Sequence, residues 1–550
     1  MRSMKRIFCL LLVCVLLLGS LPAASADTAE LISNLTGEQM TLGEFAEYCV
    51  QYFELGSQTP AANPYSDLPQ DEEQAAAILR LTALGALKGY PDGTVRPEET
   101  VDKVRAYTIA TRLSTGGEQS KPFVTMPPDV TNEMCNAQFW LANITDRSRV
   151  LMDSKAIEAL NLKTLHDPET NMFDLENFPA TVKAQSVAQS AAQFETPSAH
   201  YLGTELMGED YYQKLRDNVD AQSQPQTKYI KYGFTVRCTV MRGLPTPDAL
   251  TSTLDNPEED DFAIAALTLG EPLALYFTTA DGVMTYAVCN HCCGWVPTKD
   301  IAVCRDRSEW MKAKNPRNFL IVTGEKVYME PSADADLNEA LLTMGAKLGI
   351  VANPARTVNW RSPMENYAVQ VPCRKEDGSF YLKTALIASN RDVHVGYLPY
   401  TTENVLKQAF KCLGNRYSWG GGLHGVDCSQ YIRELYRCFG FELPRNTTWQ
   451  SKIKTAASLD WTGADQQKKC ADLDTLRPGS ILIWSAHEVL YLGKYNGRYY
   501  CISNVGKFID PGKTEEGVIK VYGVVINELD IQRTNGETWL NSLTHVTVLQ

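Results

Sequence analysis

The spacing of apolar residues predicts helices in the N-terminal part of the chain. Between residues 78 and 87 apolar side chains recur at helical intervals, and a second helical pattern begins at Thr100. The stretch between them, Gly89-Tyr90-Pro91-Asp92-Gly93-Thr94, is dense in residues that favour turns. We therefore expect a small helical region over residues 30–117 and a polar, helical linker or stabilising region over 118–225.

Alternation of apolar and polar residues predicts strands in the middle of the chain. The pattern covers residues 231–248 and 271–303, where Asp281-Gly282 marks a hairpin turn, and it returns within 318–400. These stretches predict two small β domains, at residues 226–310 and 311–400.

The C-terminal region, residues 401–550, combines an amphipathic helix with strands. After Cys428, apolar residues fall at i, i+3, i+4 and i+7, namely Ile432, Leu435, Tyr436 and Phe439, and Gly440 supplies a stop. Further on, residues 481–484 indicate a buried strand, His487 begins the next strand, and Asn496-Gly497 turns the chain into a third. The chain is therefore predicted to be a multidomain α+β protein.

Composition and the N-terminus narrow the class of protein. A chain of 550 residues is too long for one compact core, and its net charge of −13 disfavours nucleic acid as a partner. Arg2, Lys5 and Arg6 precede an apolar run, and Ala24-Ser25-Ala26 supplies a cleavage site. We expect residues 1–26 to be a signal peptide. Because no later segment approaches 18 uninterrupted apolar residues, we expect a secreted protein, extracellular or wall-associated, without a membrane span.

Cysteine usage leaves two roles open for one cluster. Of 15 cysteines, Cys9 and Cys14 lie in the signal, so an odd number remains after cleavage. The run Cys289-Asn290-His291-Cys292-Cys293 resembles a zinc-binding sequence, but no second ligand pair follows at finger-like spacing. We expect structural or disulfide roles here rather than a metal, and no cofactor.

Cys428 is the strongest candidate nucleophile. It lies in the first turn of a predicted helix beside a possible Asp427 cap, where the helix N-terminus favours a thiolate and lowers the pKa of the thiol. The preceding glycines, 420–422, suit a close backbone approach at a substrate cleft. A nucleophilic cysteine needs a base, and His487, at the head of a hairpin strand, has a better setting than His424 or His545.

Several stretches together resemble one enzyme family. "YSWGGGLHGVDCSQ", "LPRNTTWQ", "LRPGSILIW" and "HEVLYLG" resemble, in this order, the NlpC/P60 cysteine peptidases. With the β domains, whose patterns resemble bacterial SH3-like domains, residues 226–550 look like the γ-D-glutamyl-L-diamino acid endopeptidases. The turn at residues 89–94 resembles that of an S-layer homology repeat, and residues 40–53 resemble the tail helix of a preceding repeat. Such repeats bind secondary cell-wall polymers, so this region is either an anchor or a spacer.

The resemblance implies a role for each matching residue. Cys428 would attack the carbonyl of a γ-D-Glu–diamino acid bond in a peptidoglycan stem peptide, and His487 would serve as base and then as acid, in a papain-like catalytic domain. Tyr417 would help to stabilise the oxyanion. Asp427 and Ser429 would hold the free amino terminus of the substrate, although Asp427 is equally well explained as a helix cap.

The third catalytic position departs from the family. Relatives place a His, or sometimes Asn or Gln, on the strand after the base, and the matching position here is Ser503. With a strict two-residue turn at 496–497, Asn504 would share the face of His487; a one-residue bulge would bring Ser503 there instead. Three functions therefore stay open: an active wall endopeptidase, a wall-binding protein with a degenerate catalytic domain, or a related Cys-His enzyme that acts on another bond.

Overall fold

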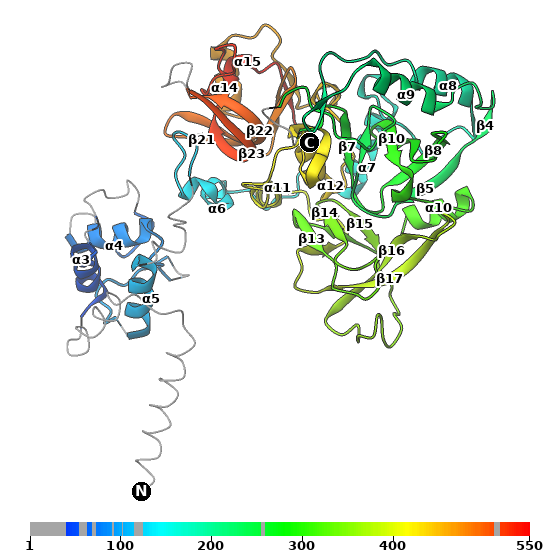
Figure 1. Cartoon of the computed structure of the whole chain (residues 1–550). Helices are drawn as coiled ribbons and strands as arrows, with labels where there is room; N and C mark the ends of the chain where they lie inside the picture. Colours follow the sequence, from blue (N-terminus) through cyan, green and yellow to red (C-terminus); the bar gives the residue numbers. More distant parts are fainter. Residues whose placement is uncertain are drawn as a thin grey trace. The chain divides into compact units, whose positions relative to one another are not determined.

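The computed structural model describes residues 40–53, 55, 63–68, 73–90, 93–101, 103–114, 125–142, 144–254, 259–510 and 517–550 (Figure 1). The expected signal peptide, residues 1–26, lies outside these ranges, as do Pro91 and Asp92 of the expected turn. The chain divides into two compact units, one mainly before residue 127 and one mainly after residue 133.

Within its described residues, the first unit contains three helices. They are α3 (Leu42–Tyr52), α4 (Glu73–Ala83) and α5 (Lys103–Ser114). Thr41 and Glu44 form a reciprocal capping box that starts α3, and the predicted apolar face of α4 is buried through Ile78 and Leu81. The helix expected from Thr100 begins at Lys103, because Thr100 instead pairs with Thr41 in a β-bridge.

The second unit begins with a helical segment that does more than link domains. It contains α6 (Ala137–Leu141), α7 (Ser154–His166), α8 (Ala184–Ala191) and α9 (Glu209–Val219), with short strand pairs between β1 (Thr181–Val182) and β4 (Lys228–Tyr229) and between β2 (Tyr201–Leu202) and β3 (Glu205–Leu206). Trp140 of α6 and Ile157 of α7 are buried in the same core as the helix of Cys428. The segment expected to be a linker or stabilising region therefore packs into the core of the C-terminal domain.

The first β unit is a seven-stranded antiparallel sheet. Its order is β11 (Ile301–Val303), β5 (Lys231–Thr235), β8 (Pro272–Thr278), β9 (Met284–Val288), β10 (Cys293–Pro297), β6 (Thr239–Arg242) and β7 (Ala263–Leu267), and α10 (Arg307–Lys314) follows it. Within residues 144–254 and 259–510 no pairing joins β11 to β7, so the sheet is open at both edges. The predicted β domain is present, but an SH3-like barrel is not confirmed.

The second β unit consists of three small sheets around one core. These are β15 (Lys347–Gly349), β12 (Phe319–Val322) and β18 (Val393–Val395); β13 (Lys326–Tyr328) and β14 (Leu341–Thr343); and β16 (Asn366–Arg374) and β17 (Phe380–Ala388). Leu320, Val371 and Ile387 contribute to the shared core. Here too, the structure gives strands where alternation predicted them, without a closed barrel among the described strands.

The C-terminal domain is a six-stranded antiparallel sheet covered by helices. The strand order is β19 (Leu459–Asp460), β24 (His545–Thr547), β20 (Ile481–Trp484), β21 (His487–Tyr495), β22 (Arg498–Ile509) and β23 (Val518–Glu528). The helical elements are α11 (Thr402–Phe410), η4 (Trp419–His424), α12 (Cys428–Arg437), α13 (Thr447–Gln450), α14 (Gln466–Leu473) and α15 (Trp539–Ser542). No helix in the described ranges is long and apolar enough to span a bilayer.

The two faces of this sheet have different covers. Ile483, Leu490 and Ile502 pack with α12 on one face, where Figure 1 shows α12 in yellow beside the orange and red strands. Trp484 and Val489 point to the other face and pack with Trp539 of α15. This alternation decides which side chains of β21 and β22 face the helix of Cys428.

Candidate active site

Cys428 is the first residue of α12, as the sequence predicted. Its cap is Asp427, whose Oδ1 accepts a hydrogen bond of 2.9 Å from the Gln430 N–H. The thiol is 6 % exposed, lies 3.9 Å from the Thr447 Oγ1 and accepts a hydrogen bond from the backbone N–H of Glu488. The Cys428 thiol is therefore held between the start of α12 and the start of β21.

The electrostatics of the thiol are opposite to the expectation. Burial, followed by the negative charges of Asp427 and Glu488, raises the pKa of Cys428 to about 12, although hydrogen bonds from Glu488 and Thr447 oppose the rise. The partial positive charge of a helix N-terminus is small compared with the loss of water around a buried sulfur. In this closed site Cys428 is a neutral thiol at neutral pH, and its activation depends on a base.

His487 begins β21 opposite Trp484. Its ring packs against Trp484 and Trp539, with centroid distances of 4.9 and 5.3 Å. Burial lowers the pKa of His487 to about 4; Asp427 opposes this shift and Arg533 adds to it. The imidazole is thus neutral at neutral pH, the form that can accept a proton. Its Nε2 is buried without a hydrogen-bond partner, and no hydrogen bond joins it to Cys428 among the described residues.

The register of β21 and β22 settles which side chain shares the His487 face. The two-residue turn pairs Tyr495 with Arg498, but a bulge between Tyr491 and Gly493 shifts the register, so that Leu490 pairs with Ile502. Ser503 therefore lies on the face of Val489 and His487. Its Oγ is fully buried and has no hydrogen-bond partner within the described part of the chain.

Asn504 lies on the opposite face of β22, toward α12. Its Nδ2 donates a hydrogen bond of 2.6 Å to the Val426 carbonyl, two residues before Cys428. Of the two positions left open by the sequence, the bulge thus places Ser503 on the His487 face, while Asn504 supports the chain that leads into the nucleophile.

Asp427 is held by an arginine that the sequence analysis missed. Arg445, from the stretch "LPRNTT", donates to both carboxylate oxygens, with a shortest distance of 2.6 Å, and also to Ser429 Oγ at 3.0 Å. Further donors to the carboxylate are the Ser429 hydroxyl and the Gln430 and Gly420 N–H groups. Burial alone would raise the pKa of Asp427, but Arg445 and these hydrogen bonds lower it. The carboxylate is ionised and already well supplied with protein donors.

Glu488 is a second acidic group that sequence reasoning overlooked. Its side chain is 1 % exposed, and neither carboxyl oxygen has a hydrogen-bond partner in the described structure. Burial, with Asp427 adding and Arg445 opposing, raises the pKa of Glu488 well above its usual value. In strand alternation Glu488 belongs with Leu490 on the α12 side. A charged residue at an apolar position of a buried strand is the signal that could have identified it.

Tyr417 lies beside the nucleophile in a half-buried position. Its backbone N–H donates to the Tyr522 carbonyl at 2.8 Å, and it pairs with Val426 in a parallel β-bridge. Burial, followed by the charges of Cys428 and Asp427, raises the pKa of the Tyr417 hydroxyl. The phenol therefore keeps its proton and is able to donate a hydrogen bond to a developing oxyanion.

The glycine-rich stretch has a packing role that the sequence analysis did not anticipate. Gly420 and Gly421 have φ values of 61° and 88°, and a Cβ on either would collide with Ala263 or Ala266 of β7. The absence of side chains at these two glycines therefore lets η4 pack directly against β7, the edge strand of the first β unit. They were expected to let backbone approach a substrate, and in this structure they join η4 to β7.

The comparisons with known proteins agree with this geometry. Residues 414–547 match the model of the NlpC/P60 family, and residues 64–103 match that of the S-layer homology domain. The chain carries an NlpC/P60 domain and an S-layer homology domain. The match identifies residues 414–547 as a domain of a cysteine peptidase family that acts on peptidoglycan, which confirms the predicted enzyme class.

Solved structures extend the similarity beyond the catalytic domain. An NlpC/P60 endopeptidase from Photobacterium damselae subsp. piscicida aligns with a TM-score of 0.63 and 18 % identity, over 77 % of this chain and 98 % of that one. An NlpC/P60 family protein from Bacillus cereus ATCC 10987 aligns with a TM-score of 0.38 and 14 % identity, over 57 % and 98 %. The first match shows a shared fold. No curated protein sequence matches the chain.

Proposed function

We propose that the protein is an exported endopeptidase that hydrolyses the γ-D-glutamyl–diamino acid bond of peptidoglycan stem peptides, with Cys428 as nucleophile and His487 as base. The observation that carries the proposal is the placement of a buried thiol at the start of α12, against the backbone of β21, where a neutral imidazole begins the strand. The NlpC/P60 match over the same residues supports the reaction class.

The protonation states favour one order of events. With a neutral thiol and a neutral imidazole, proton transfer to His487 accompanies attack of the sulfur on the carbonyl rather than preceding it. The protonated Tyr417 donates to the oxyanion, and the imidazolium then protonates the leaving amine. Ser503 has a buried hydroxyl on the same sheet face as His487, so it is the group we propose to orient the imidazole.

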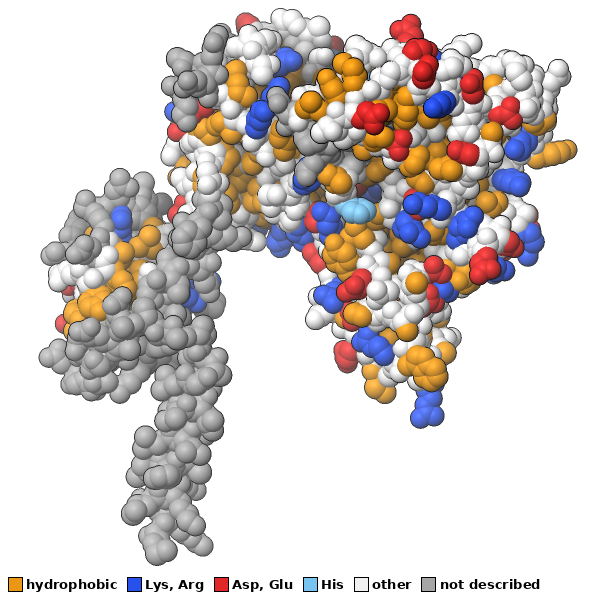
Figure 2. Space-filling model, in the orientation of Figure 1, with side chains coloured by type: hydrophobic (Ala, Val, Ile, Leu, Met, Phe, Trp, Pro, Cys, Tyr) orange, Lys and Arg blue, Asp and Glu red, His pale blue; other side chains and the backbone are white. Residues whose placement is uncertain are grey.

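Asp427 and Ser429 remain our proposed contacts for the free amino terminus of the substrate. The Asp427 carboxylate is already paired with Arg445, so a substrate ammonium would join an existing ion pair. We therefore expect only a modest preference for a free amine over its N-acyl form. Figure 2 shows Lys and Arg side chains gathered across the middle of the larger part, with Asp and Glu side chains above and below them.

The test is cleavage of L-Ala-γ-D-Glu-diaminopimelate and its N-acetylmuramyl form by residues 27–550, read by mass spectrometry. We expect release of diaminopimelate by the wild type and by Cys470→Ser, a control at a half-buried cysteine of α14, and none by Cys428→Ala or His487→Ala. Cleavage by folded Cys428→Ala would refute the nucleophile assignment. Cleavage at a different bond would indicate the related enzyme class.

A second function, wall binding by a degenerate catalytic domain, is favoured by the unpaired Ser503 hydroxyl and the missing thiol–imidazole hydrogen bond. It predicts no turnover of either peptide by a folded protein that still sediments with cell walls. We propose that the S-layer homology region supplies this retention. Removal of residues 30–117 should then reduce sedimentation with walls without altering cleavage of a soluble peptide.

A further inference from the structure

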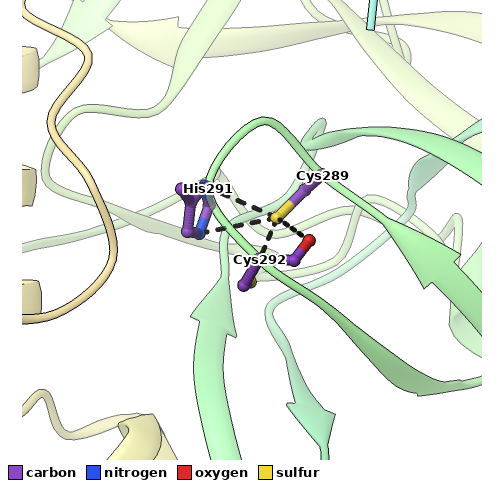
Figure 3. Close-up of side chains that lie close together, drawn as sticks. All are labelled: Cys289, His291 and Cys292. Atoms are coloured by element: carbon purple, nitrogen blue, oxygen red, sulfur yellow. Dashed lines mark hydrogen bonds between the residues drawn. The ribbon is translucent and has the colours of Figure 1, made fainter. Parts of the chain in front are cut away.

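A group of reactive side chains outside the active site lies in the hairpin between β9 and β10. Cys289, His291 and Cys292 are all buried, and their potential ligand atoms lie within 4.8 Å of one another. Figure 3 shows the Cys289 sulfur pointing toward both other side chains. The two sulfur atoms are 3.2 Å apart, and the Cys289 N–H donates to the Cys292 carbonyl at 2.9 Å.

The backbone of this hairpin suits a disulfide. Cys293 pairs with Val288, so Cys289 and Cys292 are the next opposed residues, on either side of a turn formed by Asn290 and His291. Opposed residues that share a backbone hydrogen bond have Cα atoms about 5.5 Å apart, inside the range that disulfides require. The sulfur atoms need to approach by only about 1 Å to reach a bonding distance of about 2 Å.

The surroundings of His291 argue against a divalent metal at the same place. Its Nδ1 lies 2.8 Å from the Arg433 guanidinium and 2.7 Å from the Asn290 Oδ1, so this nitrogen already has two protein partners. A divalent cation bound here would sit beside the buried positive charge of Arg433. The Met241 sulfur, 3.3 Å from the Cys292 sulfur, gives the thiols a soft, apolar neighbour.

We propose that Cys289 and Cys292 form an intramolecular disulfide in the exported protein. The proposal rests on the export included in the proposed function, because an oxidising compartment preserves such bonds. A low-molecular-weight disulfide is the oxidant: one cysteine thiolate attacks it, forming a mixed disulfide and releasing one small thiolate. The thiolate of the second cysteine then attacks the protein-side sulfur of the mixed disulfide and releases the second small thiolate. The protons lost by the two cysteines end on the two small thiols. Because both sulfur atoms are buried in the folded chain, this exchange takes place before the hairpin packs.

The bond would close a loop that contacts the helix of the nucleophile. Asn290 donates to Glu442 Oε2 at 2.9 Å, and His291 accepts from Arg433 of α12. Arg433 is 1 % exposed and also faces Glu271 and Glu442. The disulfide would therefore fix the part of the first β unit on which α12 rests, without taking part in the chemistry at Cys428.

The experiment refolds residues 27–550 in a mixture of reduced and oxidised glutathione and alkylates the remaining thiols under denaturing conditions. Peptide mapping by mass spectrometry then reads the peptide between Arg242 and Lys299, which contains Cys289, Cys292 and Cys293. We expect one alkylated thiol and one disulfide in this peptide. Cys293→Ser is the matched control and should retain the disulfide with no free thiol, whereas Cys289→Ser and Cys292→Ser should show two free thiols.

Thermal unfolding provides a second readout if a variant folds poorly. Dithiothreitol should lower the Tm of the wild type and of Cys293→Ser by about 2–4 °C and leave the Tm of Cys289→Ser unchanged. Three alkylated thiols in the refolded wild type, or stoichiometric zinc retained on those thiols, would overturn the proposal. A disulfide found in a protein that cleaves no stem peptide would refute the proposed function alone.

Discussion

Replacement of Glu488 by leucine should make the protein more stable at neutral pH. Glu488 is 1 % exposed, and no described residue forms a hydrogen bond with either carboxyl oxygen. An unsatisfied buried polar group costs about 1–3 kcal/mol. Leucine would extend the apolar face that Leu490 and Leu492 present to α12. The variant removes a polar group without leaving a partner unpaired, because Glu488 has no side-chain partner in the described structure.

The sign of the pH dependence follows from the raised pKa of Glu488. Protons bind this carboxyl more tightly in the folded state, so the neutral acid favours folding below the unfolded pKa, about 4.3. That contribution is lost as the pH rises, at about 1.4 kcal/mol per pH unit until the folded pKa is reached. The stability gained by Glu488→Leu should therefore be about 1–3 kcal/mol near pH 4, from the unsatisfied polar atoms alone, and should grow as the pH rises toward the folded pKa of Glu488.

The assay is calorimetric unfolding of the wild type, Glu488→Leu and Glu488→Gln between pH 4 and pH 8. Glutamine cannot ionise but keeps buried polar atoms. Glu488→Gln should therefore remove the pH-dependent part of the destabilisation and keep the part that comes from unsatisfied polar atoms. Since the Glu488 charge also raises the pKa of Cys428, both variants should alkylate with iodoacetamide at lower pH than the wild type. A Leu variant that is less stable than the wild type at pH 7, or an advantage that does not grow with pH, would refute the reasoning.

Two further predictions concern the residues around the nucleophile. Arg445→Met should destabilise the fold by about 3–5 kcal/mol, because it leaves the buried Asp427 carboxylate without its cation. In thermal unfolding, the double variant Arg445→Met with Asp427→Asn should recover part of this loss. Equal losses in the single and double variants would contradict the ion-pair argument. Ser503→His should raise kcat on the stem peptide, because the bulge places this position on the His487 face. A lower kcat in a folded Ser503→His variant would instead assign the orienting role to Asn504. Asn504→Ala should lower kcat through loss of the hydrogen bond to the Val426 carbonyl.

Local sequence patterns predicted the elements that carry the site, because they depend on neighbours in sequence. The helix after Cys428, the buried strand at residues 481–484 and the turn at 496–497 all follow from apolar spacing and turn chemistry. Sequence reasoning also recognised that a bulge would bring Ser503, in place of Asn504, to the His487 face. It could not decide between them, because a bulge is set by packing across the sheet.

Long-range contacts account for what the sequence did not show. Trp140 joins the catalytic core from a segment that resembles a polar linker, and Arg445 reaches Asp427 across 18 residues of chain. The pKa of Cys428 was predicted with the wrong sign because a helix N-terminus is visible in the sequence, whereas the burial of the thiol is not.

The contact between η4 and β7 makes a final prediction about how the first β unit supports the active site. Gly421 has a φ of 88°, and a Cβ there would overlap Ala266 of β7; Gly463 has a φ of 74° and open space around it. An alanine in this left-handed region costs about 1–2 kcal/mol from backbone strain alone, so Gly463→Ala measures that cost. Gly421→Ala should lose more stability than Gly463→Ala and should also lower kcat, because η4 leads directly into Asp427 and Cys428.

The difference between these two glycine variants isolates the packing of β7 from the strain of the turn. Ala266→Gly, which removes the side chain that the new Cβ would meet, should restore part of the stability and activity of Gly421→Ala. Rescue would mean that the edge strand of the β unit positions the nucleophile through η4. Equal losses in both glycine variants, without rescue, would mean that β7 only covers the loop and that the catalytic domain sets its own geometry.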